Sequence, residues 1–535
     1  MKRTLLCMGC ALLAALASAA EPDPSTVNRI LDEGMNRSEL ALTAAYLTDR
    51  IGGRMTNSPQ MRAAEKWTQE QFRKWGLQNV RAEGFEFGRG WSIERIEVRM
   101  VEPRIQVLRA IPVAWTPATR GSIDAPIIVA PMQRERHFTK WQGKLRDRIV
   151  LITQPDEGSE PDSAPFKRLS DEELGKLNVF DQPVHSTEAL KKSLENAAFM
   201  SKLDAFLAQE GALAWVRKAY RDGGLLHGEG YSYETGKSPH LPGIELAAED
   251  YRKLARLALT DAPLKLEVNS QVRYHDEDSK AYNILADLPG REAKAGYVMA
   301  GAHLDSWVAA DGAQDNGAGS AVVMEAARIL KAIGAKPKRT IRFVLWSGEE
   351  QGLLGSMAYV ERYLAARPPV TEADKAGLSP YYTWNTRWPI TPKPGSKDLV
   401  AYFNIDNGSG KLRGIYAEGN PAVVPIFRQW LEPFSSMGAT TVAARRTGGT
   451  DHVFMQTVGI PAFQFIQDPL DYGSRIHHSS IDSYDHLKMP DLKQAAVILA
   501  SFLWMSAERE QPLPRMPVPT QPDVSNPFEY PSLED

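Results

Sequence analysis

The chain has 535 residues, which is long for one hydrophobic core, so we expect at least two domains. Its 63 Lys and Arg residues nearly balance its 66 Asp and Glu residues, and a net charge of −3 argues against a nucleic-acid partner. After the first twenty residues no apolar run approaches the roughly 20 residues that a bilayer requires, so we expect no membrane span.

The first twenty residues have the pattern of a secretory signal peptide. Two basic residues precede an apolar run over residues 5–16, and small residues follow. We therefore expect export to the periplasm or the medium, with cleavage near Ala19 or Ala20. Both cysteines, Cys7 and Cys10, lie in this segment, so the mature chain would form no disulfide. A lipoprotein signal ending at Cys10 is an alternative, but few apolar residues precede that cysteine.

Helical periodicity dominates the start of the expected mature chain. Apolar residues recur at helical spacing over residues 26–75, and residues 80–87 alternate as in a strand. Residues 116–261 differ, because strand-like runs there alternate with turns and one helical stretch. We interpret them as a separate, mostly β-rich domain inserted into the first. Residues 511–535 are rich in proline and lack periodicity, which is typical of an extended strap or a disordered end.

The second half alternates short apolar strands with amphipathic helices. Such alternation is typical of an α/β fold with a mainly parallel mixed sheet covered by helices on both faces. The predicted strands are residues 283–288, 297–303, 341–346, 400–405 and 462–466. The predicted helices are residues 318–333, 353–365, 422–431 and 491–505. The chain is thus expected to divide into segments 1–20, 21–115, 116–261, 262–510 and 511–535.

Acidic residues and histidines gather where these predicted strands end. Ligands bind at the carboxyl ends of the strands in sheets of this kind. A mixture of carboxylates and imidazoles suits a pair of zinc ions, so the set predicts a metal-dependent hydrolase. In chain order the residues are His303, Asp305, Asp315, Glu349, Glu350, Asp406, His477 and His478.

The spacing of these residues indicates how some of them could act. His303 and Asp305 are two apart in an extended segment, so the carboxylate could orient the imidazole. Glu349 and Glu350 are adjacent, so one could bind metal while the other faces an attacking water. Asp315 could share its oxygens between two cations roughly 3.5–4 Å apart. The plainer alternatives are a histidine at a strand end, a helix-capping aspartate and a solvated acidic pair.

These motifs resemble those of the family 28 zinc metallopeptidases, and most of all those of its carboxypeptidase Q branch. The matching runs are His-Leu-Asp-Ser-Trp at 303–307, Asp-x-Gly-x-Gly at 315–319, Glu-Glu-Gln-Gly at 349–352 and His-His-Ser-x-x-Asp at 477–482. The resemblance covers roughly residues 26–507. It implies the zinc-exopeptidase fold, and many such enzymes carry a protease-associated domain where residues 116–261 lie here.

The resemblance also implies two zinc ions that share one carboxylate. Carried over by position, the ligands of the first ion would be His303, Asp315 and Asp406. Those of the second would be Asp315, Glu350 and His478. This assignment prefers the second histidine of the pair, because it aligns with the single family histidine that precedes a hydroxyl residue.

Three further roles follow from the same resemblance. Glu349 would be the general base and later the general acid, and Asp305 would orient His303. Many family aminopeptidases have a tyrosine directly before the histidine ligand, where it helps to hold the developing oxyanion. Here that position is His477, so we expect an imidazole to replace the phenol as the hydrogen-bond donor.

The implied reaction is hydrolysis of a peptide bond at the end of a peptide or in a dipeptide, by metal-activated water. An aminopeptidase, a dipeptidase and a carboxypeptidase all fit the predicted ligands. Two other interpretations share the scaffold: a single-zinc acyltransferase of the glutaminyl-cyclase kind, and a non-catalytic binding module. Binding modules of this kind usually lack several ligands, and two zinc ions per chain would favour the peptidase over the acyltransferase.

Two segments are candidates for the walls of a substrate pocket. In residues 445–451 an arginine could pair with a substrate carboxylate, although a solvated basic turn fits equally well. Residues 381–394 are rich in aromatic residues and proline, so they are expected to form either a lid or a surface loop. The sequence does not indicate the preferred side chain or the oligomeric state.

Overall fold

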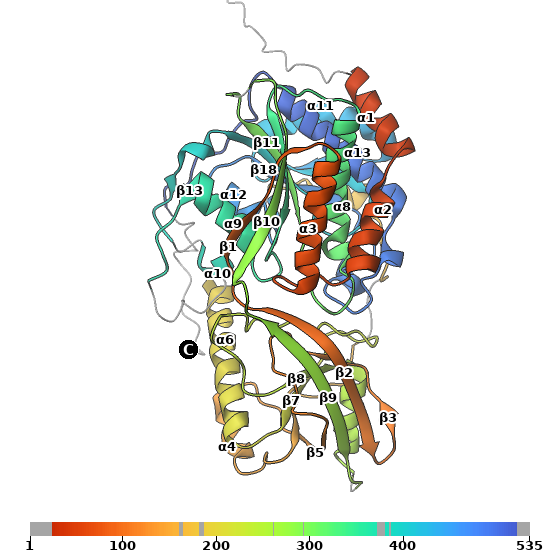
Figure 1. The fold of residues 1–535 in the computed structure, drawn as a ribbon, viewed down its shortest axis with the longest axis vertical. Helices are drawn as coiled ribbons and strands as arrows, with labels where there is room; N and C mark the ends of the chain where they lie inside the picture. Colours follow the sequence, from red (N-terminus) through yellow and green to blue (C-terminus); the bar gives the residue numbers. More distant parts are fainter. Residues whose placement is uncertain are drawn as a thin grey trace, which may run out of the picture.

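The computed structural model describes residues 24–159, 164–180, 187–260, 262–292, 294–371, 380–384 and 387–521. The predicted signal peptide and the last part of the proline-rich tail, residues 522–535, lie outside the described residues. Two units, each built on its own sheet, lie one below the other in Figure 1. We call them the first-sheet unit, residues 24–86 and 280–508, and the second-sheet unit, residues 90–275.

The first-sheet unit contains an eight-stranded mixed sheet. Its middle four strands, β12, β11, β15 and β18, run parallel, and antiparallel pairs join β1 to β10, β10 to β12 and β18 to β16. In spatial order the strands are β1 (Gln78–Glu86), β10 (Lys280–Leu288), β12 (Thr340–Trp346), β11 (Tyr297–His303), β15 (Leu399–Asn404), β18 (Ala462–Gln467), β16 (Leu412–Tyr416) and β17 (Thr441–Ala443).

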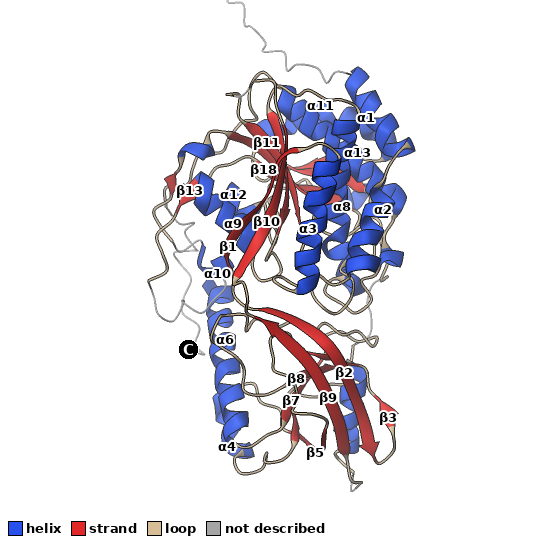
Figure 2. Ribbon diagram, in the orientation of Figure 1, coloured by secondary structure: helices blue, strands red, loops and turns tan. Residues whose placement is uncertain are grey.

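Helices cover both faces of this sheet, as Figures 1 and 2 show. The core on one face joins the sheet to α1 (Pro24–Asn36), α2 (Leu40–Ala45), α3 (Pro59–Lys74), α8 (Ala318–Ala332), α11 (Val424–Leu431) and α13 (Met489–Glu508). The core on the other face joins it to α9 (Leu354–Tyr359) and α12 (Val453–Gln456). The predicted mainly parallel, helix-covered sheet is confirmed, and β11 has the predicted bounds. No helix among the described residues is long and apolar enough to cross a membrane.

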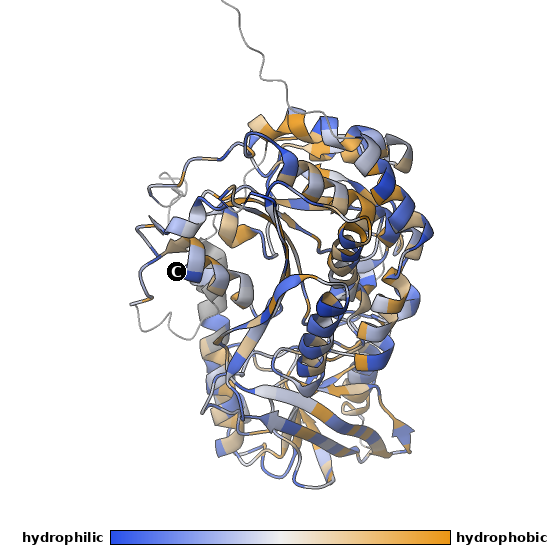
Figure 3. Cartoon of the chain, turned by 45° about the horizontal axis from the view of Figure 1, so that its top comes forward, coloured by the Kyte–Doolittle hydropathy of each residue, from blue (hydrophilic) through white to orange (hydrophobic). Residues whose placement is uncertain are grey.

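The second-sheet unit also has eight strands, and its pairs are more often antiparallel. Along its two longest strands, β2 and β9, buried and accessible residues tend to alternate, and their colours are banded in Figure 3. The spatial order is β3 (Gln106–Val107), β2 (Gly90–Glu102), β9 (Lys265–His275), β5 (Ile123–Val129), β6 (Ile149–Leu151), β7 (Ala214–Lys218), β8 (Gly243–Leu246) and β4 (Ala110–Pro112). Its helices are α4 (Phe138–Trp141), α5 (Asp171–Leu177), α6 (Thr187–Gln209) and α7 (Ala248–Leu257).

The second-sheet unit is inserted between two neighbouring strands of the first sheet. The chain leaves at the end of β1, passes into β2, and returns from β9 into β10, which pairs with β1. Strands β2 and β9 both lie outside the predicted insert, residues 116–261, and they pair with each other along their length. The identification of this unit as a protease-associated domain stays a prediction.

Aromatic side chains join the two units near the crossing point. Phe87 stacks on Tyr233 with ring centroids 4.6 Å apart, and Trp115 meets Trp307 edge to face. A second bridge comes from residues 164–177, where Arg168 pairs with Asp468 of the first-sheet unit at 2.9 Å. The two units therefore meet through a packed contact as well as through their two chain connections.

Two of the predicted peripheral segments are packed against the first-sheet unit. In the described part of the tail, Leu513 is buried and the Asn420 side-chain amide donates to the carbonyl of Pro514 at 2.8 Å. Within residues 381–394, of which 385 and 386 are not described, Trp384 is buried against Phe454. This region includes α10 (Pro380–Thr383) and the short ribbon β13 (Ala365–Ala366) with β14 (Thr391–Pro392).

Candidate metal centre

The predicted ligands meet at the carboxyl ends of the parallel strands. His303 is the last residue of β11, Glu349 and Glu350 follow β12, and Asp406 follows β15. Because parallel strands end at the same edge of the sheet, these side chains share one site. Asp315 reaches the site from the turn η3 (Ala313–Gly317) before α8, and the two histidines reach it from the loop after η9 (Tyr472–Ile476).

One cluster forms around His303. Its Nε2 atom lies 3.3 Å from Asp315 Oδ1 and 3.6 Å from Asp406 Oδ1. All three side chains are buried, and their potential ligand atoms lie within 4.8 Å of one another. This is the set that the family resemblance implies for the first zinc ion.

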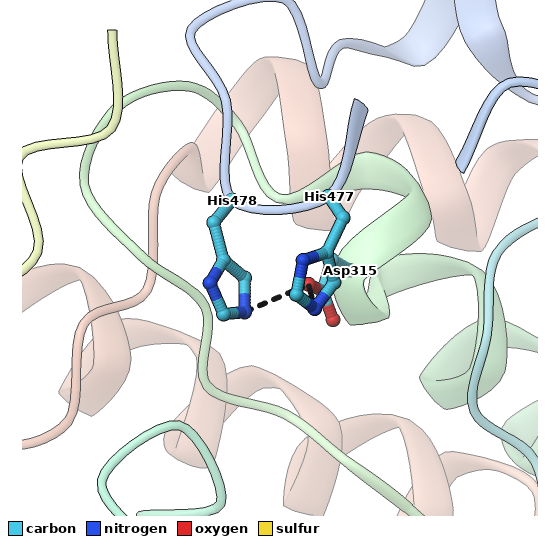
Figure 4. Close-up of side chains that lie close together, drawn as sticks. All are labelled: Asp315, His477 and His478. Carbon is cyan, nitrogen blue, oxygen red and sulfur yellow. Dashed lines mark ion pairs between the residues drawn. The ribbon is translucent and has the colours of Figure 1, made fainter. Parts of the chain in front are cut away.

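A second cluster forms around His478, on the other side of the Asp315 carboxylate. His478 Nε2 lies 3.0 Å from Glu350 Oε2 and 3.4 Å from Asp315 Oδ2 (Figure 4 shows His477 overlapping Asp315, with His478 beside them). His477 Nε2 also faces Asp315 Oδ2, at 3.8 Å. Asp315 therefore presents one carboxylate oxygen to each cluster.

The donor atoms of the site fit zinc. Asp315 Oδ2, Glu350 Oε1 and Asp406 Oδ1 are buried and accept no hydrogen bond from the described residues. Buried carboxylate oxygens normally have a hydrogen-bond or metal partner, because leaving them without one costs free energy. Imidazole nitrogens together with carboxylate oxygens are ligands that zinc prefers.

The buried carboxylates lie close together and shift the pKa values of the titratable groups in the site. Burial raises the pKa of Glu349 well above 4.5, and repulsion from Asp406 adds to this. Burial and the charge of Asp315 raise the pKa of Glu350 to about 7. Burial alone would lower the pKa of His303, but Glu349 and Asp406 outweigh it and raise this pKa well above 6.5. A bound cation would offset the repulsion that produces these shifts.

Asp305 contacts His303 and the two glutamates by different atoms. His303 Nδ1 lies 2.9 Å from the main-chain oxygen of Asp305, whereas the nearer carboxylate oxygen is 3.8 Å away. The carboxylate of Asp305 instead accepts hydrogen bonds from the main-chain N–H groups of Glu349 at 3.3 Å and Glu350 at 3.2 Å. The expected orienting contact with His303 is thus made by the carbonyl, and the carboxylate fixes the turn that carries both glutamates.

His477 lies at the edge of the site. Its ring stacks on that of His478 with centroids 3.6 Å apart, and the side chain is 37% exposed. The ring of Tyr472 meets His477 edge to face, with centroids 5.1 Å apart. Burial, reinforced by the nearby carboxylates, raises the pKa of the Tyr472 phenol well above 10, so the phenol stays protonated. Both residues border Asp315, and the oxyanion role of His477 stays a prediction.

Several residues that support the site are absent from the sequence-based predictions. Asp482 accepts hydrogen bonds from the main-chain N–H groups of Gln314 at 2.7 Å and Asp315 at 3.0 Å. Arg54 is fully buried and donates to five main-chain carbonyls, including that of Leu304 at 2.7 Å. Glu229 contacts His478 from the second-sheet unit. Only Asp482 had a nearby signal, since it ends the His-His-Ser-x-x-Asp run.

The arginines of residues 445–451 lie in a turn that the protein itself holds. Arg446 Nε donates to the main-chain oxygen of Glu418 at 3.3 Å, and the Glu418 carboxylate accepts from Thr447 N at 2.9 Å. Asp451, at the end of this run, is fully buried. Burial raises its pKa to about 8.

Known proteins resemble this chain in sequence and in fold. Residues 283–503 match the model of peptidase family M28. Carboxypeptidase Q of Bos taurus is 25% identical over 490 residues, which cover 91% of this chain and 88% of that protein. The structure of a peptidase M28 precursor from Shewanella amazonensis has a TM-score of 0.63 and 21% identity, and the match covers 92% of this chain and 98% of that one.

A further solved structure shares the fold. BSAP, a zinc aminopeptidase from Bacillus subtilis, has a TM-score of 0.55 and 18% identity, and the match covers 88% of this chain and 95% of that one. The family match covers most of the sheet whose strand ends carry the histidine and carboxylate clusters, but not β1. Residues 283–503, which contain the candidate ligands, therefore resemble peptidase family M28, and most of the chain is similar to carboxypeptidase Q of Bos taurus.

Proposed function

We propose that this protein is an exported exopeptidase with two zinc ions, which hydrolyses dipeptides or removes residues from the amino end of peptides. The observation that carries the proposal is the position of Asp315 between the two clusters. Its Oδ1 faces His303 at 3.3 Å and its Oδ2 faces His478 at 3.4 Å. A carboxylate with one oxygen directed to each imidazole suits two ions that share it.

Each side chain has a defined part in this proposal. His303, Asp315 and Asp406 would hold one ion, and Asp315, Glu350 and His478 the other. Zinc held there would supply Lewis-acid chemistry, which polarises a peptide carbonyl and makes water more acidic. Glu349 accepts a proton from the attacking water and later returns it to the leaving amine. His477 donates a hydrogen bond to the oxygen that gains charge.

Glu349 is well placed for proton transfer. Its Oε2 lies 4.0 Å from His303 Nε2, at the edge of the first cluster, and its side chain is 10% exposed. The turn that carries it is fixed by Asp305, as described above. A carboxylate held in this way can reach a water at the metal without itself being a ligand.

The experiment that tests the proposal combines metal analysis with a substrate panel. Purified protein loaded with zinc should bind two ions per chain, and it should hydrolyse free dipeptides. Amino-blocked dipeptides should resist hydrolysis. Dipeptide amides should be cleaved if the enzyme is an aminopeptidase and should also resist if it is a dipeptidase. One ion per chain would contradict the shared carboxylate and would favour the acyltransferase alternative.

A carboxypeptidase is the second candidate, because the relatives similar over most of the chain include carboxypeptidase Q. The same panel separates the two. A carboxypeptidase would cleave amino-blocked dipeptides and reject the amides, which is the reverse of the aminopeptidase pattern.

Export is part of the proposal and rests on the signal-like residues 1–20. Expression of the full chain in a bacterial host, followed by sequencing of the amino terminus, tests it. The mature protein should begin near Glu21 and should leave the cytoplasm. A chain that keeps Met1 and stays in the cytoplasm would contradict export and leave the peptidase assignment untouched.

A further inference from the structure

One partner of a predicted metal ligand comes from the other unit of the molecule. Glu229 lies between β7 and β8 of the second-sheet unit, and its Oε1 is 2.8 Å from His478 Nδ1. The two residues are 249 positions apart in the chain. Both side chains are largely buried, each with 19% exposure. The contact therefore links the inserted unit directly to the second cluster.

The two nitrogens of His478 face different groups. Nδ1 faces Glu229, whereas Nε2 faces Glu350 and Asp315. A carboxylate is a hydrogen-bond acceptor, so Nδ1 carries the proton and donates a hydrogen bond to Glu229. In neutral imidazole this leaves the lone pair of Nε2 directed into the cluster, as a metal ligand requires.

His303 has a different outer partner. Its Nδ1 is 2.9 Å from the main-chain oxygen of Asp305, only two residues away. That partner is a neutral carbonyl from the same segment, whereas the partner of His478 is a carboxylate from a separate unit. The histidine of the first cluster is therefore oriented by its own unit, whereas the histidine of the second cluster is oriented by the inserted unit.

Glu229 is itself held in place by the second-sheet unit. The Tyr220 hydroxyl donates to Glu229 Oε1 at 3.1 Å, and Arg217 Nη2 donates to the main-chain oxygen of Glu229 at 2.9 Å. Arg217 in turn pairs with Glu245 at 2.7 Å, and Glu245 is fully buried in β8. These contacts hold the Glu229 carboxylate in place.

The segment before Glu229 also fixes the loop that carries the histidines. Arg221 Nη1 donates to the main-chain oxygen of His477 at 2.6 Å. Leu226 and Ser480 exchange two hydrogen bonds: Leu226 N donates to Ser480 Oγ at 3.1 Å, and Ser480 N donates to Leu226 O at 2.8 Å. His478 has φ of 59°, a left-handed conformation that a residue with a side chain keeps only where its surroundings hold it.

We propose that Glu229 is a positioning residue, through which the second-sheet unit orients His478 for metal binding at the second cluster. The inference rests on the proposed two-ion function. Its consequence is that the inserted unit is needed to complete the metal centre. Loss of the Glu229 acceptor should weaken one of the two ions and leave the other nearly unchanged.

The test measures zinc binding as well as activity. Glu229→Ala removes the acceptor, and Glu229→Met removes it while filling a similar volume. Glu229→Gln keeps an acceptor oxygen at the same place without the charge. Glu234→Ala is the matched control, because Glu234 lies in the same segment, is exposed, and pairs only with the nearby Lys237 among the contacts described.

Removal of such an outer partner typically reduces metal affinity or activity 10- to 100-fold. By competition with a chelator, we expect Glu229→Ala and Glu229→Met to bind one of two zinc ions about 10- to 100-fold more weakly. Glu229→Gln should stay within about fivefold of the parent protein, and Glu234→Ala should match it. On a dipeptide at limiting zinc, the first two variants should lose kcat with little change in KM, and excess zinc should restore part of it.

The outcomes separate the inference from the proposed function. If Glu229→Met binds two zinc ions as tightly as the parent, Glu229 is not a positioning residue, whatever the activity. If the parent protein hydrolyses no peptide but the Glu229 variants still lose one ion, the inference stands and the proposed function fails. Should Glu229→Ala not fold, Glu229→Met and Glu229→Gln still differ only in the acceptor, so equal zinc binding by those two would overturn the inference.

Discussion

The two sheet units contribute differently to the candidate metal centre. In the first-sheet unit, the middle strands are buried and the candidate metal ligands follow their carboxyl ends. In the second-sheet unit, the long strands β2 and β9 place many side chains at the surface, and the unit supplies one carboxylate to the metal centre. The chemistry is thus concentrated in the first unit, whereas its geometry depends partly on the second. The predictions below test that division.

The largest effect should come from the proposed base in the first unit. Glu349→Gln keeps the size of the side chain but cannot accept the proton of the attacking water, so we expect kcat to fall about 10²- to 10⁴-fold. Zinc content should stay at the parent value, because Glu349 is not a proposed ligand. Steady-state kinetics on a cleaved dipeptide, with metal analysis of the same sample, checks both. A kcat close to that of the parent protein would show that Glu349 is not the general base.

The second effect concerns the buried arginine behind the site. Arg54→Met removes a donor from five main-chain carbonyls. Those of Leu47 and Gly312 also accept from main-chain N–H groups, whereas those of Gly52, Leu304 and Asp311 accept no other hydrogen bond among the contacts described. Each unsatisfied buried acceptor costs about 1–3 kcal/mol, so we expect the first-sheet unit to lose at least about 3 kcal/mol of unfolding free energy. Urea unfolding measures this. The exposed Arg50 provides the control, since Arg50→Met should change stability by less than about 0.5 kcal/mol.

Arg54 also shows where prediction from the sequence ends. The meeting of His303, Glu350 and Asp406 could be predicted because parallel strands place their ends at one edge of the sheet, whereas their assignment as zinc ligands came from the family resemblance. Nothing in the sequence around Arg54 indicates that its guanidinium is buried among carbonyls 250 residues away. Contacts of that length depend on the packing of whole elements, which local patterns do not encode.

The same limit applies to the second unit. Residues 90–102 pair with residues 265–275, which lie far away in the chain, and local patterns do not indicate which distant strand a strand pairs with. Glu229 has a glycine on either side and follows His227 by two residues, but this run does not indicate that Glu229 meets His478 across the units. Motif spacing can identify residues that share a strand end, but not a partner that arrives from an inserted unit.

A third prediction compares the two possible donors to the oxyanion, both in the first unit. His477→Ala should lower kcat about 10²-fold, which is the lower end of the range for loss of one such donor. Tyr472→Phe removes only a hydroxyl and should change kcat less than about fivefold. Kinetics of both variants, each with zinc content measured, provides the test. A larger loss of kcat in Tyr472→Phe than in His477→Ala would indicate that the Tyr472 phenol is the oxyanion donor.

The smallest effects should appear in the pH dependence of stability, where a buried glutamate in each unit behaves oppositely. Burial raises the pKa of Glu65, in α3 of the first unit, to about 7. For Glu245 in the second unit, burial is outweighed by the hydrogen bond to His227 and the charge of Arg217, which lower its pKa to about 2. An unfolded glutamate titrates near 4.5, so the two shifts have opposite signs.

The signs give opposite expectations for the two glutamine variants. The folded chain keeps the proton on Glu65 between pH 4.5 and about 7, so the contribution of Glu65 to the free energy of unfolding falls as pH rises through this window. The stability of Glu65→Gln relative to the parent should therefore increase by about 1–3 kcal/mol from pH 4.5 to 8. Glu245 stabilises the fold above pH 4.5, and this stabilisation is lost as pH falls toward 2. Glu245→Gln should therefore lower the free energy of unfolding by about 1–3 kcal/mol at pH 7 and by progressively less below pH 4.5. Hydrogen exchange followed separately in peptides of each unit measures both. Parallel pH profiles for the two variants would mean that the two units do not differ in how they accommodate buried charge.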